Sequence, residues 1–104
     1  MTRFVHPAKE DITLAGILGA LADPMRLTIL RKLLDGRDAR LSCSEAAPCV
    51  GMAKSTLSHH FRILRDAGLI RTTKRGVENL NSVRLDDVNE RFPGLLRAIM
   101  KFQP

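Results

Sequence analysis

The segment from Lys54 to Asp66 constrains the fold of this chain more than any other part of its sequence. Leu57, Phe61 and Leu64 recur at intervals of three and four residues, which is the spacing of one buried face of an α-helix. Gly68 follows, and glycine is the residue with which many helices end. Because the other side of the segment is polar and basic, the pattern predicts an amphipathic helix that packs on a core by one side only.

A short turn precedes this helix. Residues Ser42 to Ala47 begin with serine, a frequent helix cap, so we expect a short helix there that is ended by Pro48. The glycine of Val50-Gly51-Met52 then supplies a turn. A helix, a turn that contains glycine, and a second helix with a basic outer face form the helix-turn-helix arrangement.

Two further helices are expected before this unit. Asp11 is placed to cap a first helix that ends at about Ala22, and Asp23-Pro24 is a strong start for a second one that ends at Gly36. Each has an apolar stripe at helical spacing. The stripes consist of Ile12, Ala15, Leu18 and Leu21 in the first helix and of Leu27, Leu30, Leu33 and Leu34 in the second.

After the amphipathic helix the patterning becomes strand-like. Leu69 to Lys74 and Val77 to Leu85 are expected to form a hairpin around the tip Arg75-Gly76. Asp86 is expected to cap a last helical region that breaks near Pro93-Gly94. The elements together predict a mainly α (α+β) fold, namely a winged helix-turn-helix with about five helices and one β-hairpin wing.

Both ends of the predicted domain are more apolar than lone surface helices need to be. The excess lies in residues 11–22 and 93–102, and the second stretch contains Leu95, Leu96, Ile99, Met100 and Phe102. We expect these faces to bury each other across a two-fold axis, which makes the protein a homodimer. Residues 1–10 lack periodicity and are expected to be a mobile arm, so that residues 11–104 form one domain for DNA binding and dimerisation.

The balance of charge favours a polyanionic partner. The 104 residues carry a formal net charge of +6, and the pI is ≈ 10.2. Most of the excess lies between Lys54 and Arg84, where seven basic residues accompany two acidic ones. RNA-binding modules usually offer exposed aromatic rings for stacking, whereas this chain has no Trp or Tyr and four Phe. Double-stranded DNA is therefore the expected partner.

In a helix-turn-helix complex the second helix enters the major groove. The expected DNA-binding residues of that helix are Lys54, Ser55, Thr56, Ser58, His59, Arg62 and Arg65, and those of the hairpin are Arg71, Lys74 and Arg75. Among them, Arg62 and Arg65 are expected to approach phosphates, and Arg75 is expected to enter a minor groove or to touch phosphate. The alternative is that these side chains form an ordinary solvated surface.

Two segments of the chain resemble the ArsR/SmtB family of bacterial repressors. Residues 55–70 read STLSHHFRILRDAGLI, where the family pattern is S-T-V-S-R-H-L-x-x-L-R-E-A-G-L-V. Residues 20–30 read ALADPMRLTIL, where the family has A-L-A-D-P-T-R-L-x-I-L. The resemblance extends from about Leu18 to Leu85. It implies a winged-helix homodimer that represses transcription from an operator, expected to be an inverted repeat, and that leaves it when an effector, often a metal, binds.

The metal sites of that family do not carry over. The family's C-V-C motif, followed by an acidic residue, falls at Ser42-Cys43-Ser44-Glu45, where hydroxyls replace both thiolates. A second family site uses Asp and His on the last helix, and no histidine follows His60. The adjacent pair His59 and His60 projects about 100° apart on a helix and is poorly placed to share an ion. The cofactor is therefore left unassigned.

Cys43 and Cys49 are the expected effector site. Pro48 disrupts regular helix between them, so their thiols are able to converge on a thiophilic ion such as As(III), with a third ligand from the other subunit or the N-terminal arm. The alternative sensor is a disulfide between them, which would act as an oxidative switch. The alternative is that they are structural, since free cysteines often act as small buried hydrophobic residues. The protein would then be a DNA-binding regulator without metal or redox sensing.

The sequence lacks the residues that other classes of function need. The chain has no nucleophile elbow, phosphate-binding loop or paired-carboxylate motif, so we do not expect an enzyme. An adaptor that does not bind DNA stays as an alternative. The N-terminus has no signal-peptide core, and no apolar run approaches the roughly 18 residues of a membrane helix. We therefore expect a cytoplasmic protein without a membrane partner.

Overall fold

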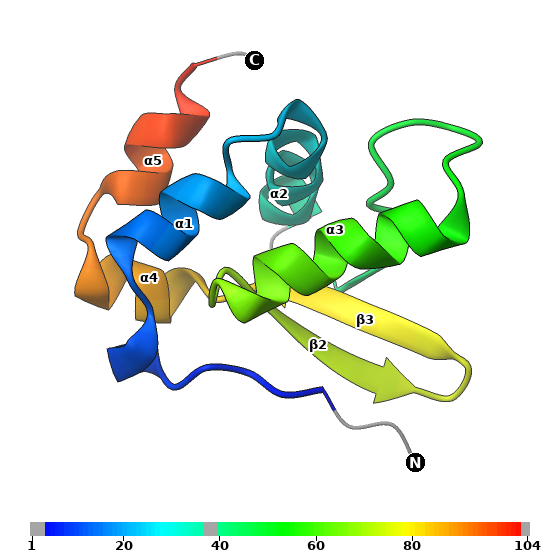
Figure 1. Cartoon of the computed structure of the whole chain (residues 1–104), viewed down its shortest axis with the longest axis horizontal. Helices are drawn as coiled ribbons and strands as arrows, with labels where there is room; N and C mark the ends of the chain where they lie inside the picture. Colours follow the sequence, from blue (N-terminus) through cyan, green and yellow to red (C-terminus); the bar gives the residue numbers. More distant parts are fainter. Residues whose placement is uncertain (1–3, 37–39, 103–104) are drawn as a thin grey trace.

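Helices surround a small antiparallel sheet in the computed structural model, which describes residues 4–36 and 40–102 (Figure 1). Helix α3 lies across the sheet, and the other helices gather at the end away from the hairpin tip. The described elements are η1 (Lys9–Asp11), α1 (Leu14–Ala20), α2 (Pro24–Gly36), β1 (Leu41–Ser42), α3 (Lys54–Asp66), β2 (Ile70–Arg75), β3 (Glu78–Val83), α4 (Leu85–Arg91) and α5 (Leu95–Met100). The predicted winged helix-turn-helix fold, with five α-helices in these ranges, is confirmed.

The sheet has the strand order β1-β3-β2, and both neighbouring pairs are antiparallel. Strands β2 and β3 form the predicted hairpin, which turns at Gly76 with a φ of 62°. Strand β1 was not predicted, because two residues are too few to show alternation. It pairs Leu41 with Asn81 and Ser42 with Leu80, so it fastens the segment before α3 to the base of the wing.

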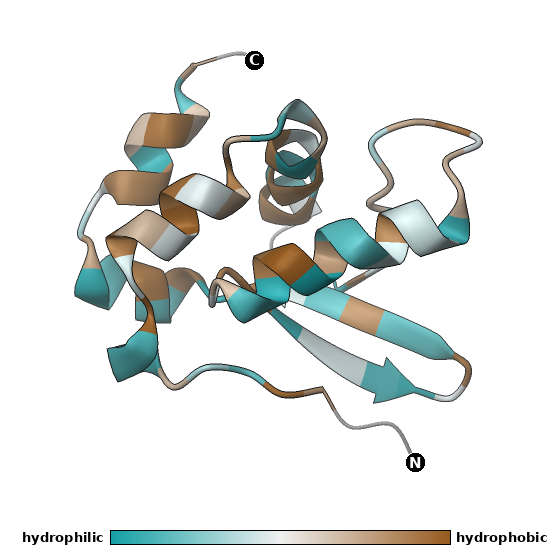
Figure 2. Ribbon diagram, in the orientation of Figure 1, coloured by the Kyte–Doolittle hydropathy of each residue, from teal (hydrophilic) through white to brown (hydrophobic). Residues whose placement is uncertain are grey.

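The core lies where the inner faces of the helices meet the sheet (Figure 2). Its largest fully buried apolar side chains are Ile12, Ile17, Ile29, Leu30, Phe61, Leu64, Leu69, Ile70, Val88 and Leu96. Gly68, which ends α3 with a φ of +83°, has a packing role as well. A Cβ at this position would lie 2.5 Å from Cγ1 of Ile12, so no other residue fits without displacing the core.

The first helix starts later than its sequence suggests. Thr13 caps α1, since its Oγ1 accepts a hydrogen bond from the Gly16 N–H at 3.0 Å, while Asp11 ends the separate turn η1. The expectation that Asp11 caps this helix is therefore wrong. Threonine and aspartate are both good caps, so sequence alone does not choose between them. With this start Ile17 points into the core, while Leu18 of the predicted apolar stripe is exposed.

The last helical region also starts differently. Asp86 lies inside the first turn of α4 rather than at its cap, where Arg84 stands. An acidic residue is favourable at either place, because the N-terminal end of a helix carries partial positive charge. The predicted break is confirmed: Gly94 has a φ of 80° and separates α4 from α5.

The expected helix from Ser42 to Ala47 is wrong. Ser42 and Glu45 do form reciprocal capping bonds, in which the Ser42 N–H donates to Glu45 Oε1 at 2.8 Å and the Glu45 N–H donates to Ser42 Oγ at 3.2 Å. These bonds close only turns, and Pro48 follows before a regular helix develops. The segment from Ser42 to Ala47, which was expected to be the first helix of the helix-turn-helix, therefore consists of turns.

The described part of the N-terminal segment lies along β2 (Figure 1). The Thr72 N–H donates to His6 Nε2 at 3.0 Å, and Arg84 Nη1 donates to the Pro7 carbonyl at 2.8 Å. We expected a mobile arm over residues 1–10. His6 and Pro7 thus have partners in the structure, residues 1–3 lie outside the described ranges, and the mobility of the segment stays a prediction.

Candidate nucleic-acid interface

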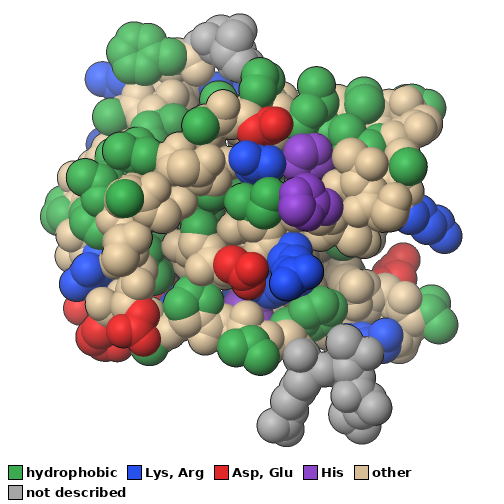
Figure 3. Space-filling model, in the orientation of Figure 1, with side chains coloured by type: hydrophobic (Ala, Val, Ile, Leu, Met, Phe, Trp, Pro, Cys, Tyr) green, Lys and Arg blue, Asp and Glu red, His purple; other side chains and the backbone are tan. Residues whose placement is uncertain are grey.

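Helix α3 turns one face to the core and the other to solvent. Leu57, His60, Phe61 and Leu64 are buried. Apart from Asp66 at the end of the helix, the exposed side chains are Lys54, Ser55, Thr56, Ser58, His59 and Arg62, all of which were predicted to bind DNA. Basic and histidine side chains lie over α3 in the space-filling view (Figure 3). We call these six residues the α3 outer face.

Helix α2 holds α3 in place through a short polar relay. Asp23 caps α2 as predicted, with Oδ1 accepting the Met25 N–H at 2.7 Å and the Arg26 N–H at 3.2 Å. Burial opposes ionisation, but these N–H groups and the Arg26 charge lower the pKa of Asp23 overall. Arg26 Nη1 then lies 3.3 Å from Nδ1 of the buried His60. This contact joins two helices.

Arg65 lies apart from the α3 outer face. Its Nη1 donates to Thr72 Oγ1 at 3.0 Å, and its guanidinium carbon is 4.4 Å from the centre of the Phe4 ring. Burial lowers its pKa, although an arginine stays charged at any physiological pH. The structure therefore places this side chain against the wing and the N-terminal segment.

The wing brings a second basic group to the surface. Lys74 and Arg75 are exposed next to the turn, and within the described ranges neither forms an ion pair or a side-chain hydrogen bond. Arg71 is also exposed, but its Nη2 lies 3.9 Å from Asp87 Oδ2 at the base of the wing. Lys74 and Arg75 are thus more available for a ligand than Arg71.

A buried polar pair beneath α3 was missed from the sequence. Thr72 Oγ1 donates to Asn81 Oδ1 at 2.8 Å, and Asn81 Nδ2 donates to the Leu41 carbonyl at 3.1 Å and to Cys43 Sγ at 3.5 Å. Both side chains are almost completely buried. Since Arg65 bonds to the same hydroxyl, a continuous chain of hydrogen bonds links Cys43 to α3. Polar residues in a strand are normally assigned to its solvent side, so no sequence signal marked them.

Both cysteines line one open cavity of ≈ 730 Å³. Cys43 is half-buried, Cys49 is exposed, and both are free thiols. Lys54 and Ser58 of the α3 outer face line the same cavity, as does Asn79, whose buried Oδ1 has no hydrogen-bond partner among residues 4–36 and 40–102. The two expected effector residues therefore line the same cavity beside the N-terminal end of α3, and their role stays a prediction.

Residues 4–36 and 40–102 contain no group of three or more His, Cys, Asp and Glu side chains that is able to hold a metal ion. No helix in the same ranges is both long and apolar enough to cross a membrane.

Comparison with known proteins places this geometry in a family. A helix-turn-helix domain model matches residues 21–73, which run from the start of α2 into β2. An uncharacterised HTH-type transcriptional regulator of Bacillus subtilis is 37% identical over 91 residues, 86% of this chain and 89% of the relative. The arsenical resistance operon repressor of Staphylococcus xylosus is 36% identical over 85 residues, 74% of each chain.

Solved structures of known proteins are also similar to this chain. A crystal structure of an ArsR family transcriptional regulator matches with a TM-score of 0.65 and 27% identity, over 96% of this chain and 100% of the other. The homodimeric winged helix-turn-helix DNA-binding domain of a Mycobacterium bovis protein matches with a TM-score of 0.64 and 25% identity, over 85% of this chain and 78% of the other. The chain therefore belongs to the ArsR family of winged helix-turn-helix transcriptional regulators.

Proposed function

We propose that this regulator is a homodimeric repressor, which binds an inverted repeat in double-stranded DNA and leaves it when a chemical signal reaches Cys43 and Cys49. The observation that carries the proposal is the α3 outer face. Six polar and basic side chains are exposed on one helix, and the free basic side chains of Lys74 and Arg75 stand at the tip of the neighbouring wing.

The α3 outer face and the basic side chains of the wing suit different parts of DNA. An α-helix fits the major groove, where Lys54, Ser55 and His59 offer donors and acceptors to base edges. Arg62 is 74% exposed and pairs only loosely with Asp66 at 3.8 Å, so it is free to turn to a phosphate. Arg75 would meet phosphate or enter the minor groove beside the wing. We leave Arg65 out of this contact set, because its guanidinium is occupied by Thr72 and Phe4.

The dimer would form through α1 and α5. Leu14 is 45% exposed, Leu18 is 49% exposed and Phe102 is 73% exposed, so these elements offer apolar side chains that a partner subunit is able to bury. The similar M. bovis domain is homodimeric. Two-fold symmetry would place two copies of α3 in major grooves about 34 Å apart, which is why we propose an inverted repeat.

The cavity beside α3 gives a route for release. An adduct on Cys43, or a disulfide with Cys49, would occupy space that Lys54 and Ser58 share. It would also disturb the hydrogen bond from Asn81, which continues through Thr72 to Arg65. A coupling of about 1–3 kcal/mol would reduce DNA affinity roughly 5- to 150-fold. We propose repression rather than activation because the S. xylosus relative is a repressor.

The test is a fluorescence anisotropy titration of the protein on its own upstream DNA and on a random duplex, at physiological salt. We expect specific binding at least about 10³-fold tighter than random binding. Equal affinities would refute the proposed repressor. Titrations with peroxide, polysulfide and As(III) should then weaken binding by wild type but not by the Cys43→Ser/Cys49→Ser double variant. If the double variant still responds, the cysteines are structural.

A further inference from the structure

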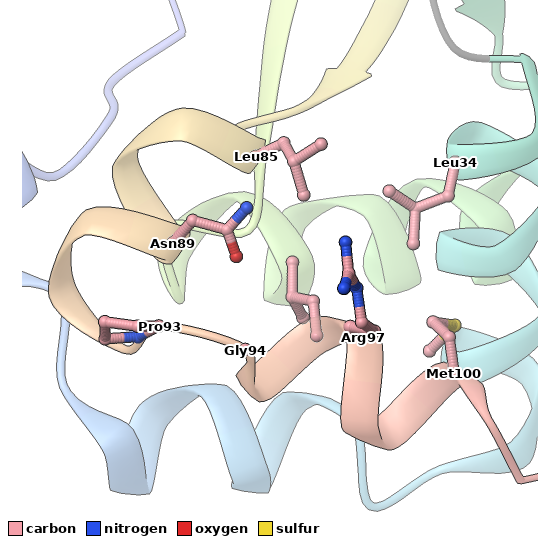
Figure 4. A pocket seen from close by; sticks show the side chains of 8 residues that line it. Leu34, Leu85, Asn89, Pro93, Gly94, Arg97 and Met100 are labelled. Carbon is pink, nitrogen blue, oxygen red and sulfur yellow. The ribbon is translucent and has the colours of Figure 1, made fainter.

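A second cavity lies on the other side of the molecule, between α2, α4 and α5 (Figure 4). Its volume is ≈ 490 Å³, which is in the range of sites for small organic molecules, roughly 300–1,000 Å³. Leu34, Leu85, Leu96 and Met100 supply apolar walls. None of the expected DNA-binding or effector residues lines it.

The break between α4 and α5 creates this cavity. Gly94 adopts a φ of 80° and turns the chain sharply, and a Cβ built at Gly94 would meet nothing within 4 Å. Arg31 of α2 fixes the far end of α5, because its guanidinium donates to the Met100 carbonyl at 3.0 Å and to the Phe102 carbonyl at 2.8 Å. The walls are therefore held by the fold before any ligand arrives.

Two polar side chains face the apolar walls. In Figure 4 the Arg97 guanidinium stands between Leu34 and Leu85, and the Asn89 amide is turned toward the same space. Within the described ranges, Arg97 and Arg75 are the two arginines that have neither a hydrogen-bond nor an ion-pair partner. Arg75 is at the wing tip, where the proposed DNA contact explains it. Arg97 is at the opposite end and has no such explanation.

We propose that this cavity binds a small amphipathic carboxylate. The guanidinium of Arg97 would hold the carboxylate by two parallel N–H···O bonds, which is the geometry that arginine favours, and the Asn89 amide would donate a further bond. The hydrocarbon part would pack against Leu34, Leu96 and Met100. A single cation among apolar walls suits one negative charge better than the two of a phosphate group.

Such a ligand would also affect the geometry of the proposed dimer. Helix α5 supplies one half of the proposed dimer face. Helix α4 follows directly from β3 of the wing, and the Arg84 N–H between these two elements donates a hydrogen bond to the Leu69 carbonyl at 2.8 Å. A molecule held between the two helices would therefore adjust the position of the wing relative to the subunit interface. This regulatory effect rests on the proposed function, whereas binding itself does not.

Sodium octanoate, used below the concentration at which it forms micelles, is the probe. Titrations of ¹⁵N-labelled protein without DNA should show saturable amide shifts concentrated in residues 85–100, and 1-octanol, which lacks the charge, should bind at least about tenfold more weakly. Arg97→Gln should weaken octanoate binding at least about tenfold and leave octanol binding unchanged, because the removed contact is charge-assisted. Arg75→Gln is the matched control, since it also loses an unpartnered guanidinium but is far from the cavity.

Three results would overturn the proposal: no saturable binding, equal binding of acid and alcohol, or equal effects of the two arginine variants. A subunit partner that covers the cavity would give the first result. A second arm measures affinity for the upstream DNA with and without octanoate, and we expect a change in wild type that Arg97→Gln abolishes. If octanoate binds and DNA affinity does not change, the binding site is supported and its proposed regulatory role is refuted.

Discussion

The two ends of this molecule present opposite chemistry to solvent. At one end, α3 and the wing expose basic and polar side chains, of which Lys74 and Arg75 have no ion-pair partner within the described residues. At the other end, α1 and the residues after α5 expose Leu14, Leu18 and Phe102. Charge attracts DNA over a distance but is weakened by salt, whereas apolar burial acts only on contact and tolerates salt. We infer that one end provides DNA recognition and the other provides assembly.

The largest expected effect comes from disrupting the apolar end. Leu14→Asp/Leu18→Asp places two charges where a partner subunit would bury leucine, and both positions are exposed enough that the monomer should still fold. We expect a monomer of 11.6 kDa by light scattering. Operator affinity should fall about 10²- to 10⁴-fold, because two linked half-sites bind far better than one. A variant that stays dimeric would show that assembly uses another surface.

The next effect belongs to the α3 outer face. Lys54→Gln and Arg62→Gln should each reduce the free energy of operator binding by about 1–3 kcal/mol if the contact is specific, and the salt dependence should become shallower. Lys101→Gln removes the same charge at the apolar end and serves as the control. If all three variants lose equal affinity, net charge rather than the α3 surface determines binding.

Arg65 sharpens the comparison within α3 itself. Arg65→Gln loses the hydrogen bond to Thr72 and the stacking on Phe4, so we expect a loss of about 1–2 kcal/mol in the free energy of unfolding. Its effect on operator affinity should be smaller than that of Arg62→Gln. Denaturant unfolding and DNA titration of the two variants measure both quantities. The opposite ranking would place Arg65 in the DNA contact.

The smallest effect is a dependence on pH at the N-terminal segment. Burial, with nearby Arg71, Arg65 and Arg84, lowers the pKa of His6 from 6.5, so the folded protein holds this ring neutral as an acceptor for the Thr72 N–H. The unfolded chain then binds the proton more readily. Stability contributed by His6 is present above pH 6.5 and is lost as the pH falls from 6.5 through the lower folded pKa.

His6→Gln should therefore flatten the decrease in melting temperature between pH 7.5 and about pH 5 relative to wild type. His59→Gln, which removes a histidine from the exposed side of α3, is the comparison variant. Identical slopes for wild type and His6→Gln would mean that His6 does not contribute to this dependence.

The sequence predicted those parts of the molecule whose structure follows from local pattern. The boundaries of α2 follow from a capping aspartate, regular apolar spacing and a final glycine. Those of α3 follow from its apolar spacing and the glycine after it, and none of these signals depends on distant residues. The α3 outer face was predictable for the same reason. The segment from Ser42 was not, because its capping pair predicts a helix start while Pro48 limits how far the helix extends.

The rest of the site depends on distant contacts. Arg65 lies at the flank of α3, where helical spacing does not decide between solvent and the wing, and only Thr72 and Phe4 determine its direction. Thr72 and Asn81 look like solvent-facing residues until their strands pair. The second cavity arises because three helices leave space around the turn at Gly94, and no sequence pattern encodes such a space.

The docking of residues 4–8 along β2 has one more consequence. Strand β2 is an outer strand of the sheet, and an uncovered outer strand invites the sheet of another molecule to join it, which is a common beginning of aggregation. The N-terminal segment lies over that edge and occupies the Thr72 N–H through His6 (Figure 1). Its position therefore covers an edge that would otherwise be open to pairing with the sheet of another molecule.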